Sequence, residues 1–377
     1  MTRKINKLIA HSCSGSWAPH NRRPRAPRLE EPVEKRYHVG LHAPINRMAT
    51  KAVSLLSGGL DSLLATKLVL DQGVEVIGLH FVSFMCDGIQ AERKQTAQKG
   101  AQDLGIRLIL RDKGPEFVEM VKKPAHGYGK NLNPCIDCKI FMLRAARAIM
   151  DAEGASFLVT GEVLGQRPMS QMRQTIAKIE RESGLDGLIL RPLSAKLFAP
   201  SRAEQGGLID RERLLAISGR SRKEQFALAA THGLQSFGTP AGGCLLTDPI
   251  YSRKLADLLS HEPFSMKDVA LLRMGRHFRI DGVKLVLGRN QSENQWLHSF
   301  WAPPYTLVYP VTFRGPTGIY KGVADRAVRK IIAAIIAFYG KESSGHATFE
   351  FFDGRPARET IEAASIDPEQ YRIKEEA

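Results

Sequence analysis

A run of small and polar residues, Ser57-Gly58-Gly59-Leu60-Asp61-Ser62, stands between an apolar stretch at 52–56 and a stretch with helical spacing at 63–70. This pattern predicts a buried strand, a tight turn and a helix, in that order. Such a turn points several backbone N–H groups and the positive end of a helix dipole at one spot, where a phosphate can bind. The hydroxyls of Ser57 and Ser62 add two donors, and the lysine of the other common phosphate loop, GxxxxGK[ST], is absent.

Two cysteines lie three residues apart in Asn133-Pro134-Cys135-Ile136-Asp137-Cys138, at the predicted start of a helix. With Lys139 beside them, both thiols are expected to have lowered pKa values and to act as nucleophiles or soft metal ligands. Cys244 follows a glycine-rich loop and supplies a third thiol. Two interpretations stay open. Either the three cysteines hold a 4Fe–4S cluster, which their number favours, or one carries a persulfide that another resolves by disulfide formation.

A third polar segment, Thr160-Gly161-Glu162-Val163-Leu164-Gly165-Gln166, follows an apolar strand pattern. A carboxylate and an amide at the carboxyl end of a strand can contact a nucleotide or bind Mg²⁺. The alternative is an ordinary helix start with Glu162 and Gln166 in the first turn.

Short apolar runs alternate with helical patterns from residue 52 to about residue 190. Strands are predicted at 52–56, 74–81, 106–110, 155–160 and 188–190, with helices at 63–70, 90–104 and 137–152. This βαβ rhythm is typical of an α/β fold with a parallel sheet. Because ligands bind at the carboxyl ends of parallel strands, the glycine turn and the segments after Phe81 and Thr160 are expected on one rim.

The character of the chain changes near residue 262, after a polar, helical stretch at 195–260. We therefore predict a first domain at 48–261 and a smaller C-terminal α+β domain at 262–377. The second domain is expected to contain helices at 266–273, 291–300 and 323–339, and strands at 276–280, 283–287 and 306–313.

The chain of 377 residues has a net charge of +15, and residues 1–47 hold ten Lys and Arg against three Glu. This basic, proline-rich segment is predicted to be a disordered extension or the result of a start site placed too early. The remaining positive charge suits a polyanion such as RNA. No apolar run is long enough to cross a membrane, no secretory signal is visible, and five cysteines do not form a disulfide framework. We therefore expect a cytoplasmic protein.

Together the motifs resemble a known family. SGGLDS after a strand resembles the PP-loop of ATP pyrophosphatases, and the order SGGLDS, CIDCKIFMLRAA, LVTGEVLGQ and LILRPL resembles tRNA 4-thiouridine synthetases. NPCxxC with a later Gly-Cys also resembles tRNA 2-thiouridine synthetases. The resemblance implies an adenine nucleotide α-hydrolase-like, Rossmann-like domain that adenylylates a uridine oxygen of tRNA and releases pyrophosphate. Sulfur then displaces AMP.

The resemblance also implies cofactors, partners and residue roles. The cofactors are ATP, Mg²⁺ and a 4Fe–4S cluster. The partners are tRNA and a sulfur donor, namely a cysteine desulfurase, a sulfur carrier or free sulfide, with no DNA. ATP would be bound by Ser57, Gly58, Gly59, Leu60, Asp61, Ser62, His80, Gly161, Glu162 and Gln166. Asp61, Cys135, Cys138 and Cys244 would be catalytic, and the three cysteines would be the cluster ligands.

The stretch MGRHFRIDGVKLVLGRNQSENQWL resembles the RNA-binding domain of NFACT proteins. This implies RNA contacts by Arg276, His277, Phe278, Arg279, Arg289 and Asn290, with arginines on phosphates and Phe278 and His277 stacked on bases. Two other functions remain open. A PP-loop ligase or amidotransferase partner acting on a small molecule would not need the cysteines, and a sulfur-insertion enzyme acting on a small molecule is a related alternative. An RNA-binding adaptor without catalysis would bind RNA but not hydrolyse ATP.

Overall fold

The computed structural model describes residues 50–82, 87–238, 244–261, 263–340, 346–362 and 365–373. The extension predicted at 1–47 lies outside the described residues. Within the described ranges, no helix combines the length and the apolar composition that crossing a membrane requires.

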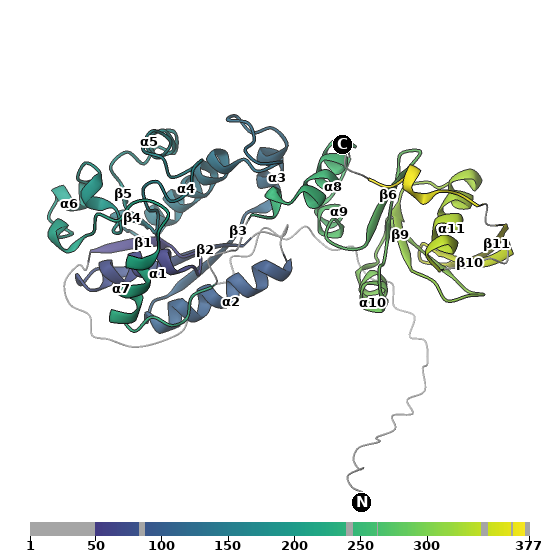
Figure 1. Cartoon of the computed structure of the whole chain (residues 1–377), viewed down its shortest axis with the longest axis horizontal. Helices are drawn as coiled ribbons and strands as arrows, with labels where there is room; N and C mark the ends of the chain where they lie inside the picture. Colours follow the sequence, from purple (N-terminus) through teal and green to yellow (C-terminus); the bar gives the residue numbers. More distant parts are fainter. Residues whose placement is uncertain are drawn as a thin grey trace, which may run out of the picture. The chain divides into compact units, whose positions relative to one another are not determined.

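The first part of the described chain forms a parallel sheet of five strands in the order β3-β2-β1-β4-β5. Its elements, labelled in Figure 1, are β1 (Lys51–Leu55), α1 (Leu60–Leu70), β2 (Glu75–Val82), α2 (Asp87–Asp103), β3 (Leu108–Asp112), α3 (Gly114–Lys122), α4 (Cys135–Ala152), β4 (Phe157–Thr160), α5 (Arg173–Glu182) and β5 (Ile189–Leu190). The predicted α/β fold with a parallel sheet is confirmed. Helices α3 and α5 were not predicted, and the helix expected to start within 160–166 does not form there.

Side chains that alternate along β1 divide the core into two layers. Ala52 belongs to an apolar cluster with Val69 of α1 and Ala229 of the later helix α7. Val53 belongs to a second cluster with Leu143 of α4. Because helices cover both faces of the sheet, a ligand reaches it at the ends of the strands.

Short helices connect this sheet to the next one. They are η2 (Ala195–Leu197), α6 (Arg202–Gln205), η3 (Arg211–Arg213), α7 (Lys223–Thr231), η4 (Leu245–Thr247), α8 (Pro249–Leu259) and α9 (Met266–Leu271). Asp248 caps α8 through the Tyr251 N–H, and Ser265 forms a capping box with Asp268 at α9. Helices α8 and α9 share an apolar cluster with α3.

The last part forms an antiparallel sheet of six strands in the order β11-β10-β8-β9-β7-β6. Its elements are β6 (Arg276–Ile280), β7 (Val283–Leu287), α10 (Gln291–Phe300), β8 (Tyr305–Pro310), β9 (Gly318–Lys321), α11 (Arg326–Gly340), β10 (His346–Phe352), β11 (Pro356–Glu362) and η5 (Pro368–Gln370). Helix α11 covers one face and α10 the other. Strands β6 and β7 and helix α10 have the predicted bounds, whereas β9, β10 and β11 were not predicted. The domain boundary at about residue 261 stays a prediction.

Candidate active site

The turn between β1 and α1 presents the first amides of α1 to a ligand. Gly59 is the N-cap residue and provides no side-chain cap, so the N–H groups of Leu60 and Asp61 precede the first helical hydrogen bond. Ser62 Oγ accepts from the Ser57 N–H at 3.2 Å and donates to the Gly59 carbonyl at 2.8 Å. These bonds fix the shape of the turn. It can therefore hold an anion at the positive end of α1.

Gly58 is expected to be irreplaceable in this turn. Its φ is +80°, and a Cβ there would lie 2.9 Å from the Ala97 amide nitrogen in α2. Because overpacking against backbone costs about 1–3 kcal/mol, Gly58→Ala should displace the turn and weaken ATP binding about tenfold or more. The control is Gly73→Ala, since Gly73 has a similar φ of +83° but no atom within 4 Å of the added Cβ. Calorimetry should find ATP affinity unchanged in this control, and equal affinities in both variants would contradict the prediction.

Asp61 lies in the first turn of α1 with one carboxylate oxygen engaged. Gln166 Nε2 donates to Asp61 Oδ2 at 2.9 Å, and Arg222 Nη2 lies 3.6 Å from the same oxygen. Within the described part of the chain, the buried atoms Asp61 Oδ1 and Gln166 Oε1 have no hydrogen-bond partner. Such atoms are costly unless a ligand satisfies them, and carboxylate and amide oxygens are suitable ligands for Mg²⁺. The pair therefore fits a magnesium ion bound together with phosphate.

Gly161 and Arg222 complete the surroundings of Asp61. A Cβ on Gly161 would lie 2.5 Å from the Ser62 amide nitrogen, so the chain after β4 packs directly against the start of α1. Arg222 is the N-cap residue of α7. Sequence reasoning missed this arginine, because no motif surrounds it and only the tertiary fold brings it to Asp61.

His80, near the carboxyl end of β2, is buried beside the turn. Its Nδ1 lies 2.8 Å from the carbonyl oxygen of Leu56, the residue before Ser57. Burial lowers the pKa of His80 most, and the neighbouring cations Arg93, Lys94 and Lys113 lower it further. The neutral ring donates from Nδ1, which leaves Nε2 as an acceptor without a partner among the described residues. The ring can therefore accept a hydrogen bond from a nucleotide amino or hydroxyl group.

Glu162 joins the start of α4 to the ends of β4 and β5. Lys139 Nζ donates to its Oε1, and Arg191 Nε donates to its Oε2 at 3.0 Å. Burial raises the pKa of Glu162, but the charges of Lys139 and Arg191 outweigh burial and lower it to about 2. Both carboxylate oxygens are engaged within the protein, so a direct contact of Glu162 with ATP stays a prediction.

Replacing Glu162 by Gln should lower the free energy of unfolding at pH 7 by about 3 kcal/mol, because it leaves buried cations uncompensated. Folding lowers the pKa of Glu162 from 4.5 to about 2, so its stabilisation is present above pH 4.5 and is lost as the pH falls towards 2. Urea unfolding at stepwise lower pH should show the difference from wild type shrinking below pH 4.5.

The control for this variant is Glu75→Gln, on the exposed pair that Glu75 forms with Lys51 at 3.5 Å. It should change the free energy of unfolding by less than about 1 kcal/mol. A difference between Glu162→Gln and wild type that stayed constant down to low pH would refute the assignment of the ion pairs.

Cys135 and Cys138 begin α4 and are both half-buried. Asn133 Nδ2 donates to Cys135 Sγ at 3.0 Å, and Lys113 Nζ donates to Cys138 Sγ at 3.5 Å. Burial raises the pKa of Cys135 and outweighs the Asn133 hydrogen bond, which lowers it. The prediction of a lowered pKa is therefore wrong for Cys135, because its sulfur is shielded from water. Cys138 has a cation beside its sulfur.

Cys244 is exposed and lies directly before η4. The Gly238 N–H donates to the Gly58 carbonyl at 3.0 Å, and Asn131 Nδ2 donates to the Thr247 carbonyl at 2.7 Å. Gly238 therefore contacts the glycine turn, and Thr247 contacts the segment that precedes α4.

The three cysteines do not form a metal-binding group in the structure. Among the residues it describes, no three or more His, Cys, Asp or Glu side chains are placed to hold a metal ion. This arrangement does not fit a 4Fe–4S cluster on Cys135, Cys138 and Cys244, and the cluster stays a prediction. Cys138 and Leu245, the neighbour of Cys244, pack against one apolar cluster, so these two cysteines lie on adjoining segments.

Two of the predicted RNA contacts are buried in the antiparallel sheet. Phe278 is 0% exposed and His277 is 2% exposed, with His277 Nε2 2.7 Å from the Met274 carbonyl oxygen. The prediction that these rings stack on bases is wrong, because Phe278 packs in the core under α11. His277 and Phe278 are neighbours in β6 and point to opposite faces of the sheet, and both faces are buried there.

The other four predicted RNA contacts have partners within the protein. Arg279 pairs with Asp257 of α8 at 2.6 Å. Arg289 pairs with Glu293, and Asn290 caps α10 by accepting the Glu293 N–H at 2.9 Å. Arg276 lies 4.5 Å from the centre of the Tyr339 ring. Arg289 remains half-exposed, at 51%, so RNA contacts by these residues stay predictions.

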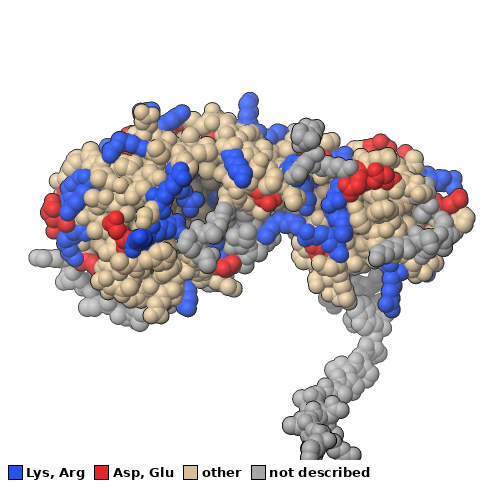
Figure 2. Space-filling model, viewed as in Figure 1, with Lys and Arg blue, Asp and Glu red and all other residues tan. Residues whose placement is uncertain are grey.

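Positive charge gathers at the rim that carries the turn. Figure 2 shows Lys and Arg side chains beside a hollow in this part of the surface. The cations that act on the site residues are Arg93, Lys94 and Lys113 near His80, Lys139 and Arg167 near Cys135, and Arg222 near Asp61. Such a site attracts polyanions.

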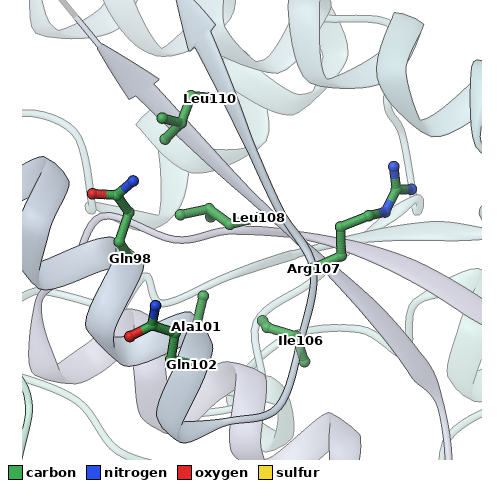
Figure 3. A pocket seen from close by; sticks show the side chains of 7 residues that line it. All are labelled: Gln98, Ala101, Gln102, Ile106, Arg107, Leu108 and Leu110. Atoms are coloured by element: carbon green, nitrogen blue, oxygen red, sulfur yellow. The ribbon is translucent and has the colours of Figure 1, made fainter. Parts of the chain in front are cut away.

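A small cavity between α2 and β3 is not part of this site. Figure 3 shows its lining, with Gln98, Ala101 and Gln102 from α2 opposite Leu108 of β3. It holds only about 50 Å³ and includes the residues that enter β3, which is the end opposite to the glycine turn.

Family models match both parts of the chain. Residues 48–196 match the model of the thiamine biosynthesis protein ThiI, and residues 275–373 match that of the NFACT protein RNA binding domain. The resemblance predicted from the motifs is confirmed for both parts.

Curated relatives match this chain over only part of their own length. A probable tRNA sulfurtransferase of Thermococcus kodakarensis is 34% identical over 144 residues, which are 38% of this chain and 36% of the relative. A probable tRNA sulfurtransferase of Methanothermobacter thermautotrophicus is 30% identical over 38% of this chain and 36% of the relative. A tRNA-specific 2-thiouridylase MnmA of Sulfurimonas denitrificans is 33% identical over 31% of this chain and 36% of the relative. The chain thus spans about a third of the length of these relatives.

Among solved structures, a 4-thiouridine synthetase in complex with RNA and bound ATP is 23% identical, with a TM-score of 0.32. The match covers 59% of this chain and 52% of that one.

Proposed function

We propose that this protein is an ATP-dependent tRNA thiolation enzyme that exchanges a uridine carbonyl oxygen for sulfur. One observation carries the proposal: the uncapped glycine turn, where Asp61 Oδ1 has no partner among the described residues, contacts Gly238, and Thr247 contacts the segment that leads into Cys135 and Cys138. The names of the curated relatives, tRNA sulfurtransferase and 2-thiouridylase, support the same chemistry. Because those relatives are matched over about a third of their length, substrate and activity are proposals.

In the first step, the uridine oxygen attacks the α-phosphorus of ATP and pyrophosphate leaves, which turns a poor leaving group into a good one. The N–H groups of Leu60 and Asp61 hold the phosphates. Arg222, which lies near Asp61 in the structure, pairs with phosphate oxygens instead when ATP is bound. Asp61 Oδ1 and Gln166 Oε1 would hold Mg²⁺, which would neutralise charge on the phosphates. His80 Nε2 accepts a hydrogen bond from the nucleotide.

In the second step, sulfur displaces AMP. Exposed Cys244 accepts a sulfane sulfur from the donor as a persulfide, whose terminal sulfur attacks the activated carbon of the base. AMP departs with the bonding electron pair. Cys138, beside the Lys113 ammonium, then attacks the Cys244 sulfur, so that the thionucleoside leaves and a disulfide forms between the two cysteines. An external dithiol reduces this disulfide before the next turnover.

The C-terminal α+β part is proposed to hold the tRNA, and its match to an RNA binding domain supports this role. Of the predicted contacts, we retain Arg276 and Arg289 for phosphate binding, since their side chains are not buried. We propose residues 262–377 as this domain and 48–261 as the catalytic one. Because tRNA and ATP are cytoplasmic molecules, we propose a cytoplasmic location.

The test uses the full chain with ATP, Mg²⁺, unmodified tRNA, a persulfide donor and a dithiol that reduces the disulfide. Mass spectrometry of digested tRNA should detect a thiouridine, and tRNA should stimulate pyrophosphate release. A rate of pyrophosphate release that is the same with and without tRNA would favour an enzyme acting on a small molecule. RNA binding without any pyrophosphate release would favour an adaptor.

A further inference from the structure

A second and larger cavity lies at the edge strand β5 of the parallel sheet, on the side of α5 and α6 in Figure 1. It encloses about 390 Å³, a volume within the usual range of small-molecule sites. All of its lining residues come from the stretch 173–204. The glycine turn at 57–62 contributes no residue to this lining.

One wall of this cavity contains a buried charge with an unused donor. The Arg191 side chain is 5% exposed, and it donates through Nε to Glu162 and through Nη1 to Glu180 at 2.8 Å. Its third nitrogen, Nη2, is buried and has no hydrogen-bond partner in the described part of the chain. A buried donor of this kind is costly to leave unpaired. Since Arg191 lines the cavity, an acceptor bound there would satisfy it.

The acids of the lining are mostly engaged. Glu180 accepts from the Gly187 N–H at 2.8 Å as well as from Arg191. Glu204 accepts from the Ser201 N–H at 2.7 Å and pairs with Arg211. The exposed charged side chains of the lining are Arg173, Arg181 and Asp186. The cavity therefore offers more unengaged cationic groups than anionic ones and suits an anion.

Two of the arginines lie near one aromatic ring. The guanidinium carbon of Arg173 lies 5.2 Å from the centre of the Phe198 ring, and that of Arg191 lies 5.6 Å from it. Ile176 and Ile189 add apolar wall. A ring and apolar wall beside guanidinium groups can bind a flat base and its phosphate together.

We propose that this cavity is a second nucleotide subsite, in which Arg191 Nη2 and Arg173 bind a phosphate and Phe198 packs against the attached base. The occupant is a nucleotide of the RNA substrate away from the reacting uridine. The choice of RNA rests on the proposed function, whereas a free nucleotide offers the same phosphate and base.

The test compares Arg173→Ala and Phe198→Ala with the control Lys178→Ala, which lies on the same helix α5 but outside the lining. Calorimetry measures the binding of a short oligouridylate, of UMP and of inorganic phosphate to the full chain, with the glycine turn occupied by a non-hydrolysable ATP analogue. Both variants should weaken oligouridylate binding about tenfold, and the control should not. Phosphate alone should respond only to Arg173→Ala, because Phe198 contacts the base.

Oligouridylate binding that is equal in both variants and in wild type would overturn the proposal. A loss confined to UMP would overturn RNA as the occupant, because a free nucleotide would then be the ligand. These measurements need no turnover, so they separate the cavity from the activity. If the protein thiolates tRNA but all variants bind oligouridylate equally, the proposed subsite is refuted and the proposed function stands. If the variants show the expected losses of binding but the protein does not thiolate tRNA, the proposed subsite stands and the proposed function is refuted.

Discussion

Asp61→Asn should reduce tRNA-stimulated pyrophosphate release by about a hundredfold or more, the usual effect of removing one group that stabilises transition-state charge. The substitution keeps the size of the side chain and a hydrogen-bond acceptor for Gln166 Nε2, which now donates to Asp61 Oδ2 at 2.9 Å. It removes the negative charge that Mg²⁺ and Arg222 require. Because Asp61 lies on α1, outside the proposed RNA-binding domain, tRNA affinity should stay within about twofold of wild type.

The matched control is Asp71→Asn, at the C-cap of the same helix, where the carboxylate pairs with Lys67. Pyrophosphate release in this variant should match wild type. Thiouridine formed at the wild-type rate by Asp61→Asn would remove the ATP assignment of the glycine turn. A parallel loss of tRNA affinity would instead place Asp61 in RNA binding.

Cys244→Ser and Cys138→Ser should each abolish thiouridine formation while leaving pyrophosphate release largely intact. Serine is nearly isosteric with cysteine, but it can neither carry a persulfide nor resolve one. In the proposed mechanism, adenylylation uses the glycine turn and does not involve these sulfurs, so the two readouts should separate. Mass spectrometry of tRNA nucleosides measures sulfur transfer, which should be lost. A pyrophosphate assay measures adenylylation, which should be retained.

Cys135→Ser decides between the persulfide route and the cluster. Burial raises the pKa of Cys135, so the persulfide route predicts that this variant loses less activity than the other two. A 4Fe–4S cluster predicts equal losses in all three variants, together with bound iron in anaerobically purified protein. Cys13→Ser, a cysteine outside both motifs, serves as the control and should behave as wild type.

Local sequence patterns were sufficient to predict the parallel sheet and its rim. Alternating apolar runs and helical spacing placed β1, β2 and β4 within two residues of their observed bounds, because buried strands and amphipathic helices have different periods. Glycines at a strand end predicted the turn, since Gly58 adopts a φ of +80° that other residues avoid. Strand β10 was missed although His346–Phe352 is rich in aromatic residues, because its partner strand β8 is distant in sequence, and β11, which pairs with β10, was missed with it.

What the sequence determined by itself was the glycine turn as a candidate phosphate site, the presence of three candidate thiols and the resemblance to thiolation enzymes, since each depends on neighbouring residues. Only the tertiary structure decided the environment of those groups. Arg222 reaches Asp61 across 161 positions, Phe278 of the RNA-binding motif is buried beneath α11, and Cys135 is shielded enough for its pKa to rise. The physical reason is that charge pairing and burial depend on distance in space, which a spacing along the chain does not specify.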